Sequence, residues 1–318
     1  MSRIVICGAT GFIGRNLVEH FRQREADEII AVAHRRPPFE LAGVKWVQAD
    51  LRDAKAVNEV VRNADIVIQA AATTSGAKDI TSKPFIHVTD NAVMNSLLLR
   101  AAYENAVRHF VFFSCTVMYP SSPAPVKEDG FNAEISDKYF GVGWTKVYIE
   151  KMCEFYARLG RTKHTVIRHS NIYGPHDKFD LERSHVFGAS VTKAMLAERS
   201  LTIWGTGEER RDLLHVDDLM RFVTLALERQ SSAFGLYNCG AGQSVSVREL
   251  VERIAGATGK KLTLDHDLSK PTIPFDLTLD CAKARSELGW EPEISLPEGI
   301  ERTIAWWRQN VDPIALSA

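Results

Sequence analysis

The feature that most constrains this chain is a glycine-rich turn between an apolar run and an amphipathic segment. Residues 4–7 form the short apolar run of a buried strand, and Gly8, Gly11 and Gly14 follow at intervals of three. Apolar residues at helical spacing then continue over 12–21. A strand that turns into a helix through glycines lets backbone amides approach a pyrophosphate, whose charge the helix N-terminus stabilises. The spacing G-x-x-G-x-x-G differs from the commoner G-x-G-x-x-G, but its position still predicts a bound dinucleotide. The cofactor-binding residues expected in this turn are Gly8, Thr10, Gly11, Phe12, Ile13 and Gly14.

The end of the next expected strand, residues 28–33, indicates which dinucleotide is bound. It is followed by His34, Arg35 and Arg36, about twenty residues after the last glycine. An NAD site usually carries Asp or Glu here for the ribose 2′-hydroxyl, whereas Arg suits a 2′-phosphate. Two arginines and no acid therefore favour NADP over NAD, with a solvated basic loop as the alternative.

Apolar runs and helical patterns alternate along the first half of the chain. Further strands are expected over 44–47, 66–68, 110–113 and 165–168, and helices over 91–104 and 142–159, with Asp53 capping a helix that runs to Arg62. This alternation predicts an α/β fold with a doubly wound parallel (Rossmann) sheet. Ligands of such sheets lie beyond the carboxyl ends of the strands. The residues expected near the cofactor there are Asp50, Leu51, Ala70, Ala71, Ala72 and Ser114.

Composition excludes several classes of partner. The 318 residues include 39 basic and 40 acidic side chains and no basic run, so neither nucleic acid nor an anionic membrane is an expected partner. We find no signal peptide and no apolar run long enough to span a bilayer. The five scattered cysteines, without a C-x-x-C, favour reduced thiols in the cytoplasm. The histidines show no metal-binding spacing, so no metal is expected.

Beyond residue 170 the strand–helix alternation loosens. We expect a loop from Asn171, then a helix over 186–199, a strand over 201–204 and a segment 213–216, with Asp217 or Asp218 as the cap of the next helix. A strand at 236–238 is expected to return to the large sheet, and a helix is expected over 247–258. This pattern predicts an NADP-binding domain over 1–170, which also takes the returning segment near 213–240, and a smaller substrate lobe over 171–318.

Nearly the whole chain resembles the extended short-chain dehydrogenase/reductases that act on nucleotide-diphosphate sugars. The segments that carry the resemblance are GATGFIG at 8, AAA at 70, NIYGPHDKFD at 171, SHV at 184, IWGTGEERRDLLHVDDL at 203 and ISLPEGI at 294. NIYGPHD followed by SHV is similar to the GDP-L-fucose synthases, which epimerise and then reduce a GDP-4-keto-6-deoxy sugar with NADPH. The resemblance implies this class of substrate, an NADP cofactor beside His169 and Ile172, and a homodimer formed through the helices expected at 91–104 and 142–159.

The family's chemistry uses a Ser or Thr, a Tyr and a Lys, the last two spaced Y-x-x-x-K. Lys146 matches the lysine, which lowers the tyrosine pKa and holds the nicotinamide ribose. The tyrosine position holds Val142 and the Ser/Thr position holds Cys115; the cysteine used for epimerisation is replaced by Val117, while its partner histidine is matched by His185. Because valine cannot exchange a proton, and a positioned acid typically contributes on the order of 10²–10⁴ in rate, another group must act.

Three groups are candidates for that proton transfer. Tyr139 lies seven residues before Lys146, Cys115 is a weak acid whose pKa a nearby lysine would depress, and His185 could act alone. Packing alone could also explain Tyr139 and Cys115. On the substrate side the resemblance points to a diphosphate held by Arg211 and Lys193, with Asn171 near the sugar and Trp204 near the nucleotide.

Two functions therefore remain open. The first is an NADP-dependent epimerase/reductase acting on a nucleotide-linked 4-keto-6-deoxyhexose, most simply GDP-linked, through a non-standard proton donor. The second is a catalytically silent protein that binds NADP, with or without a nucleotide sugar, as a sensor or pathway partner. A dehydratase is disfavoured, because those relatives carry acids just after the Ser/Thr position, where this chain has Thr116 and Val117.

Overall fold

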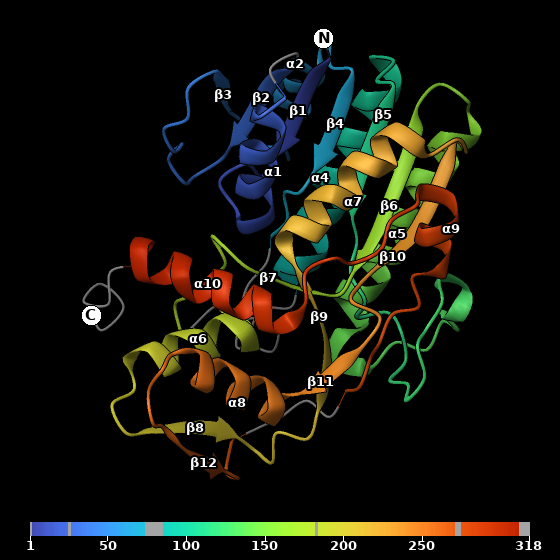
Figure 1. The fold of residues 1–318 in the computed structure, drawn as a ribbon. Coiled ribbons are helices and arrows are strands. Elements are labelled where there is room, and N and C mark those ends of the chain that lie inside the picture. Colours follow the sequence, from blue (N-terminus) through green and yellow to red (C-terminus); the bar gives the residue numbers. More distant parts are fainter. Residues whose placement is uncertain (1, 25–26, 74–84, 182–183, 271–274, 312–318) are drawn as a thin grey trace.

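A computed structural model describes residues 2–24, 27–73, 85–181, 184–270 and 275–311 of the chain. Its centre is a parallel seven-stranded sheet in the order β10-β6-β5-β4-β1-β2-β3 (Figure 1). The order reverses between β1 and β4, as in a doubly wound sheet, which confirms the predicted fold class. The strands of this sheet are β1 (Arg3–Cys7), β2 (Glu28–Ala33), β3 (Val44–Gln48), β4 (Ile66–Gln69), β5 (His109–Phe113), β6 (Lys163–His169) and β10 (Phe234–Cys239).

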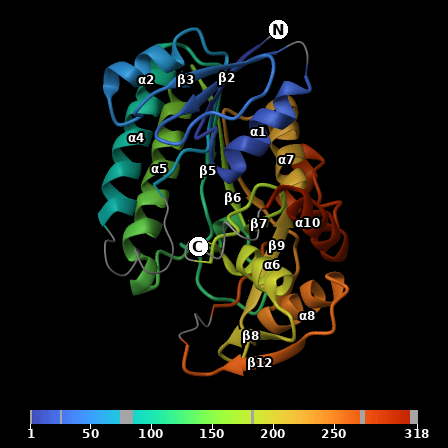
Figure 2. The ribbon, with the colours of Figure 1, turned by 90° about the vertical axis from the view of Figure 1, so that its left-hand side faces the viewer.

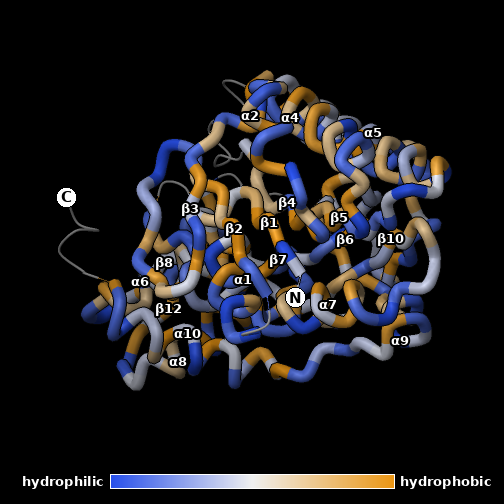
Figure 3. The backbone as a smooth tube through the Cα atoms, turned by 90° about the horizontal axis from the view of Figure 1, so that it is seen from above, coloured by the Kyte–Doolittle hydropathy of each residue, from blue (hydrophilic) through white to orange (hydrophobic). Residues whose placement is uncertain are grey.

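Helices cover both faces of this sheet, because its strands are apolar on both sides. Helices α1 (Phe12–Arg22) and α7 (Val216–Arg229) pack on one face through Leu17 and Phe222. Helices α2 (Ala54–Val61), α4 (Phe85–Glu104) and α5 (Phe140–Arg158) pack on the other through side chains such as Ile149. Figure 2 shows the two helix layers on opposite sides of the strands, and Figure 3 shows the hydrophobic colouring of β1 and β2 between them.

Two expectations about which residues cap helices can be compared with the structure. Asp53 caps α2, and its side chain accepts a hydrogen bond from the Ala56 amide at 2.7 Å, as predicted. The expectation that Asp217 or Asp218 caps α7 is wrong: the cap is His215, whose ring accepts from the Asp217 amide. Both acids lie in the first turn of the helix, where their negative charge interacts favourably with the positive end of the helix dipole.

The C-terminal part forms two small sheets and a separate core. Strand β9 (Arg210–His215) lies between β7 (Asn171–Tyr173) and β11 (Ser244–Ser246), and β8 (Ser200–Trp204) pairs with β12 (Thr263–Asp267). The expectation of a loop from Asn171 is thus wrong for its first three residues, and β12 has no counterpart among the expected elements. The remaining elements are α6 (Val186–Leu196), α8 (Val247–Ala257), α9 (Ala282–Leu288), α10 (Leu296–Asn310) and the short 3₁₀ turns η1 (Glu128–Gly130) and η2 (Asp137–Tyr139).

The C-terminal core is built mainly from α6, α8 and α10, and it includes the buried Phe187, Ile254 and Trp307. The chain returns to the large sheet at β10, which pairs in parallel with β6 along the edge. Among the described residues, no helix has the length and apolar character that crossing a membrane requires.

Candidate functional site

The glycine turn between β1 and α1 is shaped by two very close backbone approaches. Gly8 has φ +72°, and a Cβ atom there would lie 2.7 Å from the Ala71 Cα atom after β4. A Cβ on Gly14 would lie 2.0 Å from the Gly8 carbonyl oxygen. The Gly11 amide donates to that same oxygen at 2.9 Å, which closes the turn. Because the first amides of α1 have no partner inside the helix, the turn presents donors to an anion where β1 and β4 diverge.

The end of β2 is basic and open. His34, Arg35 and Arg36 are all exposed, and the His34 Nε2 atom lies 3.6 Å from the Asp50 Oδ2 atom. Asp50 is held by Arg52, whose Nη2 atom donates to Oδ2 at 2.7 Å, and these hydrogen bonds keep the pKa of Asp50 well below its usual range. The Asp50 carboxylate beside the end of β2 is therefore already engaged by Arg52.

Lys146 lies on α5 at the carboxyl end of β5. Its Nζ atom donates to the Phe113 carbonyl oxygen at 2.8 Å and lies 4.7 Å from the centre of the Phe112 ring. Burial lowers the pKa of Lys146, while the charges of Cys115 and Glu150 act in the opposite direction. Val142 is partly buried one helical turn earlier.

Cys115 and His169 lie within electrostatic reach of this lysine, and His185 lies within reach of His169. Burial raises the pKa of the Cys115 thiol, against the opposing charge of Lys146. Burial, together with the charges of Lys146 and His185, lowers the pKa of His169 to about 4, so its ring lies within electrostatic reach of both. The His169 Nδ1 atom lies 2.8 Å from the Ser170 carbonyl oxygen, so the neutral ring donates there and keeps Nε2 as an acceptor. His185 caps α6 and is exposed, yet surrounding protein atoms and Lys178 lower its pKa.

Tyr139 lies within electrostatic reach of Cys115. It ends η2 and caps α5, one turn before Val142. Burial raises the pKa of the Tyr139 hydroxyl, the positive charge of Arg211 lowers it, and Cys115 raises it. The structure therefore brings Tyr139, Cys115 and Arg211 within electrostatic reach of one another, although they lie far apart in sequence.

The remaining substrate candidates lie in the C-terminal part. Trp204 is 50% exposed at the end of β8, and the Lys193 Nζ atom lies 5.0 Å from the centre of its ring. Asn171 is partly buried and donates from Nδ2 to the Asp212 carbonyl oxygen at 3.1 Å, while its neighbour Ile172 is buried. Lys193 and Trp204 thus form a cationic and aromatic pair that is separate from the contacts around Lys146.

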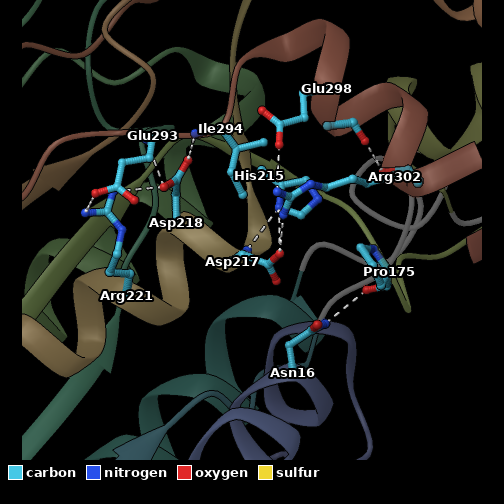
Figure 4. Close-up of polar contacts among 12 residues, drawn as sticks. Asn16, Pro175, His215, Asp217, Asp218, Arg221, Glu293, Ile294, Glu298 and Arg302 are labelled. Atoms are coloured by element: carbon cyan, nitrogen blue, oxygen red, sulfur yellow. Dashed lines mark hydrogen bonds and ion pairs between the residues drawn. The ribbon is translucent and has the colours of Figure 1, made fainter.

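The segment after β7 is joined to the large sheet by polar contacts. Asn16 of α1 donates to the Pro175 carbonyl oxygen at 3.0 Å (Figure 4). In the same view Arg302 of α10 lies between Glu298 and Asp217, with its Nη1 atom 3.3 Å from the Asp217 Oδ2 atom. The first contact joins α1 to the segment after β7, and the second joins α10 to α7.

Sequence reasoning missed a buried polar group behind Lys146. Arg168 of β6 pairs with Glu150 of α5 at 2.6 Å, and each side chain is 4% exposed. The one available signal was the position of Glu150, four residues after Lys146 on an otherwise inward-facing helix surface.

A cavity of about 160 Å³ lies next to this ion pair. It is lined by residues from η1, α5, β6 and β10 and by none of the sequence-predicted site residues; Glu150, Arg168 and Phe234 are among the lining residues. Within the described ranges, no group of three or more His, Cys, Asp or Glu side chains is arranged to hold a metal ion.

The sheet, the glycine turn and the lysine at its carboxyl edge define a dinucleotide-binding protein of the short-chain dehydrogenase type. The family model of the NAD dependent epimerase/dehydratase family matches residues 4–240, and the chain belongs to that family.

Known proteins similar to this chain match it over nearly its full length. GDP-L-fucose synthase 1 of Arabidopsis thaliana is 28% identical over 98% of this chain and 94% of the relative. The UDP-glucose 4-epimerase of Thermotoga maritima, solved with UDP-glucose, has a TM-score of 0.87 and 25% identity over 98% of this chain and 100% of that one. MoeE5, solved with UDP-glucuronic acid and NAD, has a TM-score of 0.84 and 25% identity over 98% and 100% of the two chains. This chain is thus a member of a family of NAD(P)-dependent enzymes that act on nucleotide sugars.

Proposed function

We propose that this protein is an NADP-dependent epimerase/reductase that acts on a nucleotide-linked 4-keto-6-deoxyhexose, with GDP as the nucleotide, through a proton donor other than the usual tyrosine. Residues 1–170, with the returning segment near 213–240, hold the cofactor, and residues 171–318 hold most of the sugar nucleotide. The glycine turn fits the cofactor's pyrophosphate, because Gly8 and Gly14 allow a backbone turn so tight that a Cβ atom on either would meet backbone atoms, and this turn leads into the N-terminus of α1. Arg35 and Arg36 favour a 2′-phosphate. The free cysteines agree with the cytoplasmic location that we propose.

The observation that carries this proposal is the environment of Lys146. Its ammonium group lies largely away from water beside Cys115, and it donates a hydrogen bond to the Phe113 carbonyl oxygen. The carboxylate of Glu150, whose charge acts on Lys146, is already paired with Arg168. A buried ammonium without its own carboxylate is costly and occurs mainly where a charge is used. Lys146 therefore supports chemistry at the carboxyl edge of the sheet.

The residues divide the reaction as follows. The bound cofactor, as NADPH, supplies hydride to the 4-keto carbon. Lys146 holds the cofactor ribose and places a positive charge beside the proton donor. The keto oxygen takes its proton from Tyr139, Cys115 or His185, and Tyr139 is favoured because it begins α5, in the turn before Val142, within electrostatic reach of Cys115 and Arg211. Arg211 and Lys193 hold the diphosphate, and Trp204 packs against the base.

The test is turnover of GDP-4-keto-6-deoxymannose with NADPH, followed at 340 nm, with products identified by NMR. Lys146→Met should reduce the rate at least 100-fold, because it removes the charge at the reacting centre. Lys151→Met is the matched control, since this lysine of the same helix has a 73% exposed side chain. If no hydride is consumed and no epimer is formed, while another nucleotide sugar turns over, the substrate assignment is wrong.

Val142 favours a second candidate, a catalytically silent binding protein. The family's tyrosine position holds valine in this chain, and such a replacement is expected in a protein that has lost catalytic activity. Val142→Tyr separates the two functions. An inert native protein that gains turnover with this substitution would be a binding protein. Native turnover that Tyr139→Phe, Cys115→Ala or His185→Ala abolishes would exclude the silent function.

The homodimer that we propose uses the outer surface of α4 and α5. Phe85 of α4 is 65% exposed, and Tyr148 and Phe155 of α5 are 52% and 56% exposed. The two helices lie side by side on one flank of the molecule (Figure 2). Because aromatic side chains on one exposed helix surface mark an association site, a second copy fits here. Phe155→Glu should give a monomer in size-exclusion chromatography with light scattering, whereas Leu268→Glu, at a 72% exposed site elsewhere, should not.

A further inference from the structure

The buried ion pair between Glu150 and Arg168 stands behind the proposed reacting centre and takes no direct part in it. The contact is a fork, in which the Arg168 Nε atom donates to Oε1 at 3.0 Å and the Nη2 atom donates to Oε2 at 2.6 Å. Glu150 belongs to α5, one turn after Lys146, and Arg168 belongs to β6. The pair thus joins the lysine helix to the sheet in a fixed geometry.

Both members of the pair also bind the loop that follows β5. The Ser114 hydroxyl donates to the Glu150 Oε1 atom at 2.5 Å. The Arg168 Nη1 atom donates to the Tyr119 hydroxyl oxygen at 2.8 Å. Tyr119 in turn donates to the Asn238 Oδ1 atom of β10 at 2.8 Å. The loop is therefore attached to the same ion pair at residue 114 and again at residue 119.

Cys115 lies between these two attachment points. On the upstream side, the Phe113 carbonyl oxygen accepts from Lys146, so the loop is also fixed to α5 directly. The separation of Cys115 and Lys146 thus depends on how the Glu150–Arg168 pair holds the loop against the helix. Neither Glu150 nor Arg168 needs to contact a ligand for this effect.

The energetics of buried ion pairs support a positional role. Transferring two charges from water to the interior is costly, and well-packed apolar side chains of similar volume often give equal or greater stability. What apolar side chains do not supply is the directional fork and the additional hydrogen bonds to Ser114 and Tyr119. We propose that Glu150 and Arg168 are positioning residues that fix the Cys115 loop relative to Lys146. This inference rests on the proposed function for its catalytic consequence, but the positioning itself can be measured without turnover.

The experiment follows alkylation of Cys115 by iodoacetamide in the native full-length protein, located by peptide mass spectrometry. Cys153 provides an internal control, because it is fully buried on the same helix and reacts only if α5 opens. The variants are Ser114→Ala, which removes one attachment without changing charge, and the double variant Glu150→Met with Arg168→Met. Ser96→Ala is the matched control, since this serine of α4 donates to the Ala92 carbonyl oxygen of its own helix and to the Met152 sulfur of α5, and neither partner lies in the Cys115 loop.

We expect Cys115 to react at least fivefold faster in Ser114→Ala and in the double variant, with Cys153 unchanged and unfolding still cooperative. Rates within twofold of the native protein in Ser114→Ala would overturn the inference. So would parallel acceleration of Cys153, because the pair would then hold the fold and not the loop. If the double variant does not fold, the Cys115 alkylation rate in Ser114→Ala alone decides whether the inference holds.

Turnover adds a separate measurement. Where the native protein reduces the GDP-sugar, Ser114→Ala should lower kcat at least tenfold and change KM for the sugar less than threefold, because the sugar contacts lie elsewhere. An inactive native protein with selective Cys115 acceleration would refute the proposed function and leave the positioning inference supported. Turnover with unchanged Cys115 reactivity would refute the inference alone.

Discussion

Two buried histidines at the amino end of the large sheet should make this protein sensitive to mild acid. His109 and His164 are 6% and 0% exposed. Burial lowers the pKa of His109 to about 3 and that of His164 to about 4. The His109 Nε2 atom lies 2.7 Å from the Thr165 hydroxyl, which itself donates to the Gln230 Oε1 atom, so the neutral ring must donate to Thr165. Protonating His109 would therefore place a positive charge in the protein interior.

The size of the effect follows from the difference in proton binding. In the unfolded chain each histidine has a pKa of 6.5, whereas in the folded protein both remain neutral at pH 5.5. Because the unfolded state alone gains protons, each histidine lowers the free energy of unfolding by about 1.4 kcal/mol between pH 7.5 and 5.5. The two together contribute about 2.7 kcal/mol, a substantial part of the ~5–15 kcal/mol of a typical domain. This stability is present above pH 6.5 and is lost as the pH falls toward 3.

The assay is urea unfolding at pH 7.5 and 5.5, followed by tryptophan fluorescence, for the native protein and for His109→Gln. Glutamine keeps a donor for Thr165 but does not titrate. The native protein should lose about 1.4 kcal/mol more than the variant between the two pH values. Asp177 acts in the opposite direction, since burial raises its pKa to about 7, but its contribution cancels in the comparison. Equal losses for the two proteins would refute the reasoning.

Three further predictions concern the cofactor half. Gly14→Ala should abolish saturable NADPH binding in fluorescence titration, because its Cβ atom would meet the Gly8 carbonyl oxygen at 2.0 Å; ordinary affinity would contradict this. Arg35→Ala with Arg36→Ala should weaken NADPH binding at least tenfold by calorimetry while leaving NADH binding within threefold, and equal losses for both would contradict a 2′-phosphate contact. Asp53→Ala should lower the free energy of unfolding in urea by about 1 kcal/mol through loss of the α2 cap; no change would show that water replaces the cap.

The large sheet could be predicted from the sequence because its evidence is local. Buried parallel strands are continuous apolar runs, and the glycine turn shows where β1 ends and α1 begins. Strands β7 and β12 could not be predicted in this way. The first has three residues, and the second, TLDHD, is largely polar and exposed. β7 becomes a strand because it pairs with β9, and β12 because it pairs with β8. Neither pairing can be inferred from the residues of the segment itself.

The candidate site shows the same division. The residues of the glycine turn could be found by spacing and Lys146 by the resemblance to the family, and their roles remain predictions. The approach of Tyr139 to Arg211 and the network of Ser114, Glu150 and Arg168 could not be found, because each joins residues that only the folded sheet brings together. The cap of α7 was mispredicted for a related reason. Acids are preferred caps, and nothing local to residues 215–218 shows that a buried histidine takes the position.

The late return of β10 to the sheet has a consequence for how the protein is made. Residues 234–239 complete the edge beside β6, whose own residues 163–169 leave the ribosome about seventy residues earlier. Until then β6 offers unpaired backbone groups and the apolar side chains of Val166 and Ile167 to any neighbouring chain. Premature termination between these two segments should therefore yield aggregates that trap chaperones, even though every residue of the glycine turn and Lys146 has been synthesised.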